Sequence, residues 1–197
     1  MAIIIATVYV LNIIPAFAPP TWIVLSLIEL NQPQLHPLSL AVTGAFAATF
    51  GRMTLAMLSQ RIIRNKLMSE SSKENIDALK NVLESRKNQT VWAFLAYSFT
   101  PLPSNYLFIA YGLTTLPIRL VAVPFFIGRL ASYFFWIALA QETNKVLDID
   151  FIGEYLSAYF IVTQVALLLL IYAFTKVDWR AALTERKFRW LKRKHIE

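Results

Sequence analysis

Two arginines lie inside stretches that are otherwise almost wholly apolar, Arg52 and Arg129, and each directly follows a glycine. An arginine in the hydrocarbon core of a bilayer costs about 2.5–3.5 kcal/mol on insertion scales, so such a residue marks a pathway or has a partner. The polar residues expected near them are Ser104, Asn105 and Glu29. Together these groups can hold an anion by charge and by hydrogen bonds. No hydrolase, kinase or dinucleotide-binding motif accompanies them, so we do not expect an enzyme.

Each charged candidate also has a structural interpretation that the sequence leaves open. Arg129 either lines a groove that binds an anion or pairs internally with Glu29 or with carbonyl groups of a nearby hairpin. Arg52 either lines the same groove or extends its side chain to the cytoplasmic face. We expect Glu29 to be an interfacial loop acid, with a proton carrier as the alternative.

The composition indicates an all-α integral membrane protein. The chain has 197 residues, of which 57% are hydrophobic and 16% charged, and its mean hydropathy is +0.52. A soluble domain of this size has more charge and shorter apolar runs. The chain has no cysteine, which excludes a disulfide scaffold and a thiolate site, and its two histidines are His36 and His195. We therefore expect no metal and no cofactor.

The elements that must position the arginines are broken by proline. The stretch Phe99–Trp136 is almost wholly apolar, yet it contains four prolines, two glycines and two arginines. Broken backbone at membrane depth survives only where protein surrounds it or a wet cavity reaches it. We interpret this stretch as a re-entrant hairpin followed by a spanning helix. An earlier stretch has two apolar arms too short to span and a similar break, and the expected hairpin breaks are Pro15, Pro19, Pro20, Pro101 and Pro103.

The order of these elements predicts one membrane domain over residues 1–177 and a basic interfacial tail over 178–197. The domain consists of a re-entrant hairpin 2–30, a span 38–59, a cytoplasmic amphipathic segment 60–88, a re-entrant hairpin 91–116, a span 118–140 and a span 151–175.

The charge distribution predicts the orientation of the chain. Ser59–Asn88 has seven Lys and Arg against four acids, and Lys176–Glu197 has eight against three, whereas Gln141–Asp150 has one against three. Positive flanks of apolar segments stay in the cytoplasm, so both basic segments and the C-terminus are expected there. We expect the tail to bind anionic lipid headgroups and expect no nucleic-acid partner.

The two halves share an order of features, which predicts an internal repeat. Phe17-Ala-Pro-Pro20 is followed by an apolar arm, a helix and Gly51-Arg52; Phe99-Thr-Pro-Leu-Pro103 is followed by an apolar arm, a helix and Gly128-Arg129. The predicted topology gives the two copies opposite orientations. Inverted repeats whose broken helices meet at mid-membrane are typical of transporters.

The second copy, FTPLPSNYLFIAYGLTTLP followed by FFIGRLASYFFW, resembles the DedA superfamily, also called the VTT or SNARE-associated membrane domain. The resemblance covers roughly residues 12–141. It implies two re-entrant hairpins that face each other across a bacterial or archaeal plasma membrane, and movement of polyprenyl-phosphate or phospholipid between leaflets. Bacterial members carry an acid after the first break and an arginine after the second, where this chain has Thr21-Trp22 and Ser104-Asn105. The cations that match the family are then Arg52 and Arg129.

The expected function is translocation of an anionic or polyprenyl-phosphate lipid between leaflets, with passive movement favoured over proton coupling. The alternatives are a small-molecule or ion exporter on the same scaffold and a non-transporting membrane scaffold. The expected partners are membrane lipids, and the sequence leaves open whether the chain forms a homo-oligomer.

Overall fold

The computed structural model describes residues 1–32, 34–100, 102–142 and 158–184, and these residues form helices without a β-strand. This confirms the all-helical class. Within the described residues two helices are long and apolar enough to cross a membrane, Pro37–Leu67 and Arg119–Gln141. They contain nearly all of the predicted spans 38–59 and 118–140.

A first pair of helices surrounds the first proline break. Helix α1 (Ala2–Ile13) ends where the chain meets Pro15, and helix α2 (Thr21–Asn31) begins directly after Pro20. Proline lacks the backbone N–H and disfavours helix in the preceding residue, so one continuous helix is excluded here. Within the break Phe17 has a φ of 63°, which bulky residues rarely adopt. The chain reverses its direction at this point.

Helix α3 (Pro37–Ser59) follows the first pair. Pro37 occupies the first turn, where a missing N–H breaks no helical bond, and the His36 ring accepts a hydrogen bond from the Leu38 N–H at 3.3 Å. The helix continues directly into η1 (Gln60–Leu67), whose π-helical turns are wider than those of an α-helix. The helical rod therefore extends beyond the predicted end of the span at residue 59.

A second pair of helices surrounds the second break. Helix α5 (Lys87–Phe99) begins four residues before the hairpin boundary predicted at residue 91, and helix α6 (Asn105–Leu113) begins after Pro103. Helix α7 (Arg119–Glu142) follows and contains Pro124 in its interior. Between α3–η1 and α5 lies helix α4 (Glu70–Ser85).

The C-terminal part of the chain is described over two helices, α9 (Ala158–Lys176) and α10 (Trp179–Thr184). The predicted third span, 151–175, is thus described from Ala158 onward. Most of the predicted acidic loop 141–150, and residues 185–197 of the predicted tail, lie outside the described residues.

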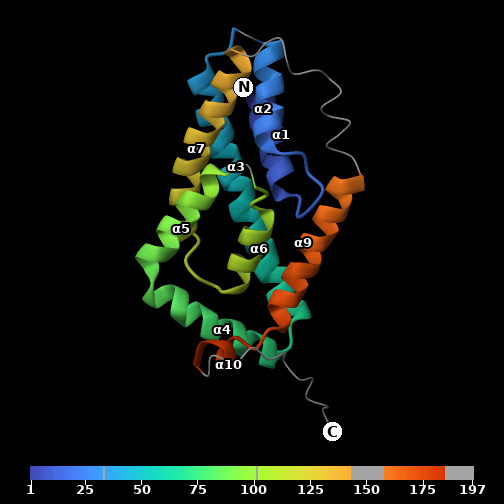
Figure 1. Ribbon diagram of the computed structural model, residues 1–197, viewed down its shortest axis with the longest axis vertical. Helices are drawn as coiled ribbons and strands as arrows, with labels where there is room; N and C mark the ends of the chain where they lie inside the picture. Colours follow the sequence, from blue (N-terminus) through green and yellow to red (C-terminus); the bar gives the residue numbers. More distant parts are fainter. Residues whose placement is uncertain (33, 101, 143–157, 185–197) are drawn as a thin grey trace.

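The two helix pairs enter the bundle from opposite ends. Figure 1 shows α1 and α2 at one end, and α5 and α6 on the side of α4 and α10; α3 runs through the middle, and α7 lies beside it at the end of α1 and α2. The first helix of each pair packs on the long helix that follows it, α1 on α3 and α5 on α7. The second helix of each pair packs on the other long helix, α2 on α7 and α6 on α3.

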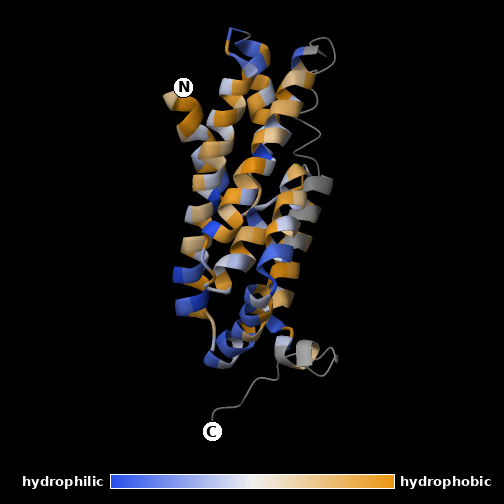
Figure 2. Ribbon diagram, turned by 90° about the vertical axis from the view of Figure 1, so that its left-hand side faces the viewer, coloured by the Kyte–Doolittle hydropathy of each residue, from blue (hydrophilic) through white to orange (hydrophobic). Residues whose placement is uncertain are grey.

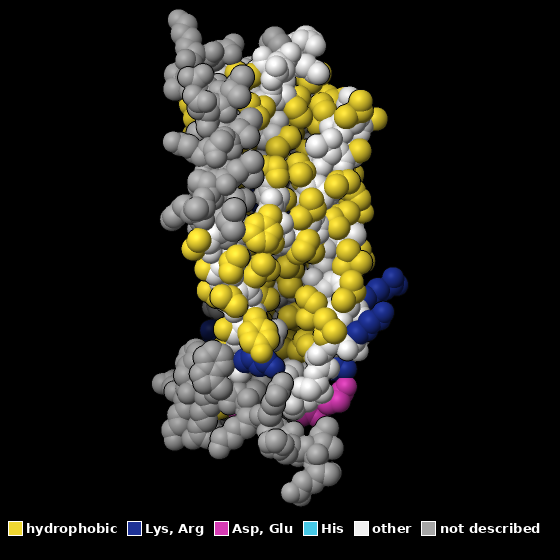
Figure 3. Space-filling model, turned by 90° about the vertical axis from the view of Figure 1, so that its right-hand side faces the viewer, with side chains coloured by type: hydrophobic (Ala, Val, Ile, Leu, Met, Phe, Trp, Pro, Cys, Tyr) yellow, Lys and Arg dark blue, Asp and Glu magenta, His cyan; other side chains and the backbone are white. Residues whose placement is uncertain are grey.

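The exterior of the bundle is apolar over most of its length. Figure 2 shows hydrophobic residues along the helices and hydrophilic residues concentrated at the end that holds η1 and α4. In Figure 3 hydrophobic side chains cover one face up to a group of Lys and Arg side chains at that same end. This surface fits a membrane protein with a basic end, here defined as η1 and α4.

Two hydrophobic clusters form the interior, one at each end. One cluster joins α1, α2, α3 and α7 through residues such as Val8, Leu25 and Tyr133. The other joins the end of α3 to α5, α6 and α7 through Phe94, Phe108 and similar residues. Buried polar residues from both helix pairs also lie inside the bundle, among them Asn12, Ser98, Ser104, Asn105, Arg52 and Arg129.

At the basic end Arg64 connects three elements. Its Nη2 lies 2.8 and 2.9 Å from the two carboxylate oxygens of Asp77 in α4, and its Nη1 donates to the Leu113 carbonyl in α6 at 2.6 Å. Arg64 is buried, whereas the Asp77 side chain is 44% exposed. The contact fixes η1 between α4 and α6.

We expect Arg64→Ala to lower the free energy of unfolding by about 2 kcal/mol, within the usual range for hydrogen bonds to a charged group. Thermal unfolding in detergent measures this as a lower midpoint. The control is Lys73→Ala, which removes a surface pair with Glu70, a side chain that is 83% exposed, and should cost less than about 0.5 kcal/mol. Equal losses in the two variants would contradict the structural role of Arg64.

Candidate functional site

The two proline breaks meet inside the bundle. The Asn105 side-chain amide, at the start of α6, donates to the carbonyl of Pro15 in the first break. Ser104, which precedes it, accepts a hydrogen bond from Arg52 of α3. Residues of both breaks, of α3 and of α7 therefore form one network of hydrogen bonds centred on buried side chains, which we call the junction: Asn12, Pro15, Arg52, Thr100, Leu102, Ser104, Asn105 and Arg129.

Arg52 joins the two halves of the junction. Its Nε donates to Ser104 Oγ at 3.1 Å, and its Nη1 donates to the Asn12 carbonyl near the end of α1 at 3.0 Å. Its side chain is directed into the bundle, and the residue is only 8% exposed. The alternative in which Arg52 extends to the cytoplasmic face is therefore wrong.

Arg129 holds the second break. Its Nη1 donates to the Thr100 carbonyl and its Nη2 to the Leu102 carbonyl, each at 3.0 Å. The guanidinium also lies 5.2 Å from the ring centroid of Phe125 and 5.8 Å from that of Tyr133, within the range of cation–π interactions. Of the two internal partners considered from the sequence, the carbonyls of the break accept from Arg129 and Glu29 does not pair with it.

The glycine before each arginine allows the same close approach in both halves. A Cβ on Gly51 would lie 2.7 Å from both the Tyr9 carbonyl oxygen and Asn12 Cβ in α1. A Cβ on Gly128 would lie 1.8 Å from Ser98 Oγ and 3.1 Å from the Leu95 carbonyl oxygen in α5. In each half the contacted residues are three positions apart, and the second of them is the penultimate residue of its helix. The close approach at the glycine thus places Arg52 at the end of α1 and Arg129 at the end of α5.

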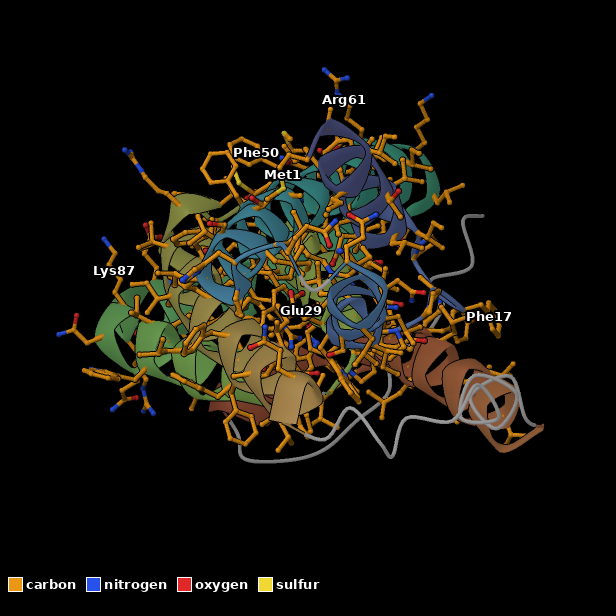
Figure 4. The ribbon with its side chains drawn as sticks, turned by 90° about the horizontal axis from the view of Figure 1, so that it is seen from above. Met1, Phe17, Glu29, Phe50, Arg61 and Lys87 are labelled. Carbon is orange, nitrogen blue, oxygen red and sulfur yellow. The ribbon has the colours of Figure 1, made fainter. Side chains whose placement is uncertain are left out.

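Glu29 does not belong to the junction. It lies near the other end of α2, where Gln141 of α7 donates a hydrogen bond to one of its carboxylate oxygens. Twelve residues of helix separate Arg129 from Gln141, which corresponds to about 18 Å. The prediction of an interfacial loop acid is also wrong, because Glu29 is helical and 1% exposed. Figure 4 labels Glu29 within the bundle, whereas Arg61 and Lys87 point outward.

The prolines of the breaks contribute backbone groups rather than side-chain chemistry. The Pro15 carbonyl accepts from Asn105, and the Pro103 carbonyl accepts from the Tyr97 hydroxyl at 2.8 Å. Pro20 is the N-cap of α2, and Pro101 lies outside the described residues.

Asn12 is a residue of the junction that was not predicted from the sequence. Its side-chain amide donates to the Val8 carbonyl at 2.8 Å and to Thr21 Oγ1 at 2.9 Å, and its own carbonyl accepts from Arg52. It therefore joins the end of α1 to the start of α2. The signal was present, since Asn12 is an amide within a long apolar run.

The junction contains two positive charges and, among the described residues, no carboxylate that pairs with either of them. The ion pairs found in this part of the chain are Arg64–Asp77 and Lys73–Glu70. The positive charges of Arg129 and Arg52 repel each other. Hydrogen bonds to carbonyl and hydroxyl groups solvate a guanidinium but leave its charge uncompensated. The arrangement can attract an anionic group.

No family model, no curated protein and no solved structure matches this chain. Over the described residues no three His, Cys, Asp or Glu side chains come together as a metal site. The geometry of the junction and the apolar surface around it are therefore what indicates a function.

Proposed function

We propose that the protein translocates anionic lipid between the leaflets of a membrane, with the junction as the place where the lipid phosphate crosses. The observation that carries this proposal is the pair of buried guanidinium groups, Arg52 and Arg129, that have no carboxylate partner among the described residues. A lipid phosphate is an anion whose oxygens match the donor geometry of arginine. It would supply the compensating charge while it passes.

The helix arrangement supports a re-entrant, inverted-repeat architecture. The packing of α1 on α3 corresponds to that of α5 on α7, and the packing of α2 on α7 corresponds to that of α6 on α3. Each Gly-Arg pair meets the end of the first helix of its own hairpin. Transporters with inverted repeats bind their substrates where such broken helices meet. In this proposal the two breaks lie near the middle of the bilayer.

The exterior of the breaks favours a lipid over a soluble ion. Phe17 in the first break is 46% exposed, and Phe99 and Leu102 beside the second are 50% and 52% exposed. Figure 4 labels Phe17 at the periphery of the bundle. Leu102 connects the junction with the apolar surface. Its carbonyl accepts a hydrogen bond from buried Arg129, while its side chain is exposed on that surface. Acyl chains could follow this surface while a headgroup contacts the junction.

The orientation follows from the charges. The basic end holds Arg61, Arg64, Lys66 and further cations, so we place it in the cytoplasm and the end with Glu29 outside. The C-terminus then lies in the cytoplasm, where the basic tail would bind anionic headgroups. A divergent member of the DedA superfamily would have this arrangement, and we propose that relationship on the residues already named.

The test is the rate of lipid exchange between leaflets in reconstituted vesicles. Fluorescent phosphatidylglycerol and phosphatidylcholine with the same acyl label are compared, and an impermeant reductant bleaches label in the outer leaflet. We expect both lipids to exchange faster than in protein-free vesicles, and the anionic lipid to exchange faster than the zwitterionic one.

The same vesicles separate lipid movement from solute export. A trapped soluble anion should remain inside while the labelled lipid exchanges. Release of the solute without lipid exchange would reject lipid translocation in favour of an exporter, and absence of both would favour a non-transporting scaffold.

A further inference from the structure

Five buried polar atoms have no hydrogen-bond partner among the described residues, and all five belong to helices α2 and α7. In α2 they are Trp22 Nε1, Ser26 Oγ and Glu29 Oε2; in α7 they are Arg129 Nε and Ser132 Oγ. Ser26 and Ser132 are 3% and 4% exposed. Their concentration on two helices indicates a common cause.

The two helices that carry these atoms contact each other at two points, and we call the row of five atoms the α2–α7 seam. Trp22 stacks on Trp136 of α7 with ring centroids 4.6 Å apart, and Glu29 accepts a hydrogen bond from Gln141 of α7. Ser26 lies four residues after Trp22 and three before Glu29, so helical geometry places it on the same face of α2.

The α7 side of the seam has the same spacing. Ser132 lies three residues after Arg129 and four before Trp136, which places all three residues on one face of α7. Because Trp136 contacts Trp22, this face is directed at α2. The seam therefore extends from Arg129 of the junction to Glu29 at the opposite end of α2.

The length of the seam excludes a single small ligand. From Arg129 to Gln141 the helix rises by about 18 Å, so the five atoms cannot all contact one phosphate or one ion. A buried polar atom without a partner costs about 1–3 kcal/mol of folding free energy. Five such atoms would together cost about as much as the entire free energy of unfolding of a typical domain. A row of small polar molecules satisfies all five, and water, with room for 2–4 hydrogen bonds each, has the required chemistry.

We propose that the α2–α7 seam holds a file of water molecules that connects Arg129 with the Glu29 end of the bundle. The seam offers water both donors, from Trp22 and Arg129, and an acceptor, Glu29, with two hydroxyl groups between them. The file hydrates the junction from the end opposite to the basic end. The corresponding α3–α6 interface is dry in this account, since Gly112 lies directly against the Ala56 backbone and none of the five atoms belongs to it.

Single cysteines test the seam directly, because the native chain contains none. Ser26→Cys and Ser132→Cys are nearly isosteric, and Thr49→Cys is the control. Thr49 in α3 is 6% exposed, and its hydroxyl donates to the Ala45 carbonyl at 2.7 Å. Each variant is reconstituted in vesicles and treated with methyl methanethiosulfonate, a small neutral reagent. The cysteine thiolate attacks its sulfenyl sulfur, a mixed disulfide forms and methanesulfinate leaves.

A thiol in apolar surroundings keeps its proton and reacts slowly, whereas a hydrated thiol ionises. We expect Ser26→Cys and Ser132→Cys to react at least about tenfold faster than Thr49→Cys, because a larger fraction of a hydrated thiol is ionised to the reactive thiolate. The mass of the intact protein is followed with time, and denatured samples show that all three thiols can react. Seam cysteines as slow as Thr49→Cys in the folded protein would overturn the proposal.

A second measurement does not depend on cysteine. Removing a dry, unpartnered hydroxyl stabilises a protein, whereas removing a hydrated one sacrifices its bond to water. We expect Ser132→Ala to lower the thermal midpoint in detergent, and a higher midpoint would contradict a hydrated seam. Lipid exchange is separate from both readouts: reactive seam cysteines without lipid exchange would reject the proposed function and leave the seam standing.

Discussion

Arg129→Met should abolish accelerated lipid exchange and also lower the stability of the protein. Methionine keeps an unbranched apolar side chain beside Phe125 and Tyr133 but removes the charge and the donors to the Thr100 and Leu102 carbonyls. A carbonyl that loses its partner costs up to about 1–3 kcal/mol when it is buried, and these two are partly buried. The lost charge also removes the attraction for the lipid phosphate during crossing, and each 1.4 kcal/mol added to that barrier slows exchange tenfold, so we expect the exchange rate to fall by more than about tenfold. Exchange rate and thermal midpoint are measured on the same preparation.

Two further substitutions separate charge from hydrogen-bond geometry. Arg129→Lys keeps the charge but cannot reproduce the two-pronged contact with both carbonyls, so partial activity is expected. Arg119→Met is the matched control, because Arg119 is an exposed arginine at the start of the same helix. If Arg129→Met exchanges lipid at the native rate while folded, the proposed role of the junction is rejected.

Gly128→Ala should destabilise the contact between α5 and α7 and displace Arg129. The new Cβ would lie 1.8 Å from Ser98 Oγ and 2.8 Å from Ser98 Cβ, so α5 and α7 would have to separate. Overpacking of this kind typically costs about 1–3 kcal/mol. The separation would also move Arg129 away from the carbonyls of the second break, so lipid exchange should fall together with the thermal midpoint.

Two further variants test whether the clash between residue 128 and Ser98 causes the loss. Ser98→Ala in the same chain removes the nearest atom and should restore part of the stability, whereas Ala131→Val adds volume to an exposed residue of the same helix and should cost little. A Gly128→Ala protein as stable as the native protein would show that α5 and α7 do not need their close approach.

Local chemistry made part of this structure predictable from sequence. Pro15, Pro20 and Pro103 interrupt helices for reasons that lie within a few residues, so the two breaks fall where the prolines indicate. The Gly-Arg pairs were also visible, because a glycine followed by arginine is conspicuous in an apolar helix. Arg52, Arg129, Ser104 and Asn105 meet at the junction because polar groups of both breaks face the bundle interior.

Long-range contacts decided what the sequence could not predict. Glu29 was expected in a loop because a carboxylate in an apolar arm usually reaches water, but Gln141, more than a hundred residues away, donates to it inside the bundle. The partners of Arg129 were open for the same reason, since a carbonyl at any break can accept from it. The wide turns of η1 left no hydrophobic pattern distinct from that of an α-helix.

The most direct measurement is the fraction of fluorescent phosphatidylglycerol that an impermeant reductant bleaches in sealed vesicles containing the native protein. If the junction carries anionic lipid across the membrane, the label of both leaflets is bleached in native vesicles, and only that of the outer leaflet in vesicles with Arg129→Met. Bleaching confined to the outer leaflet in vesicles that contain folded native protein would contradict the account.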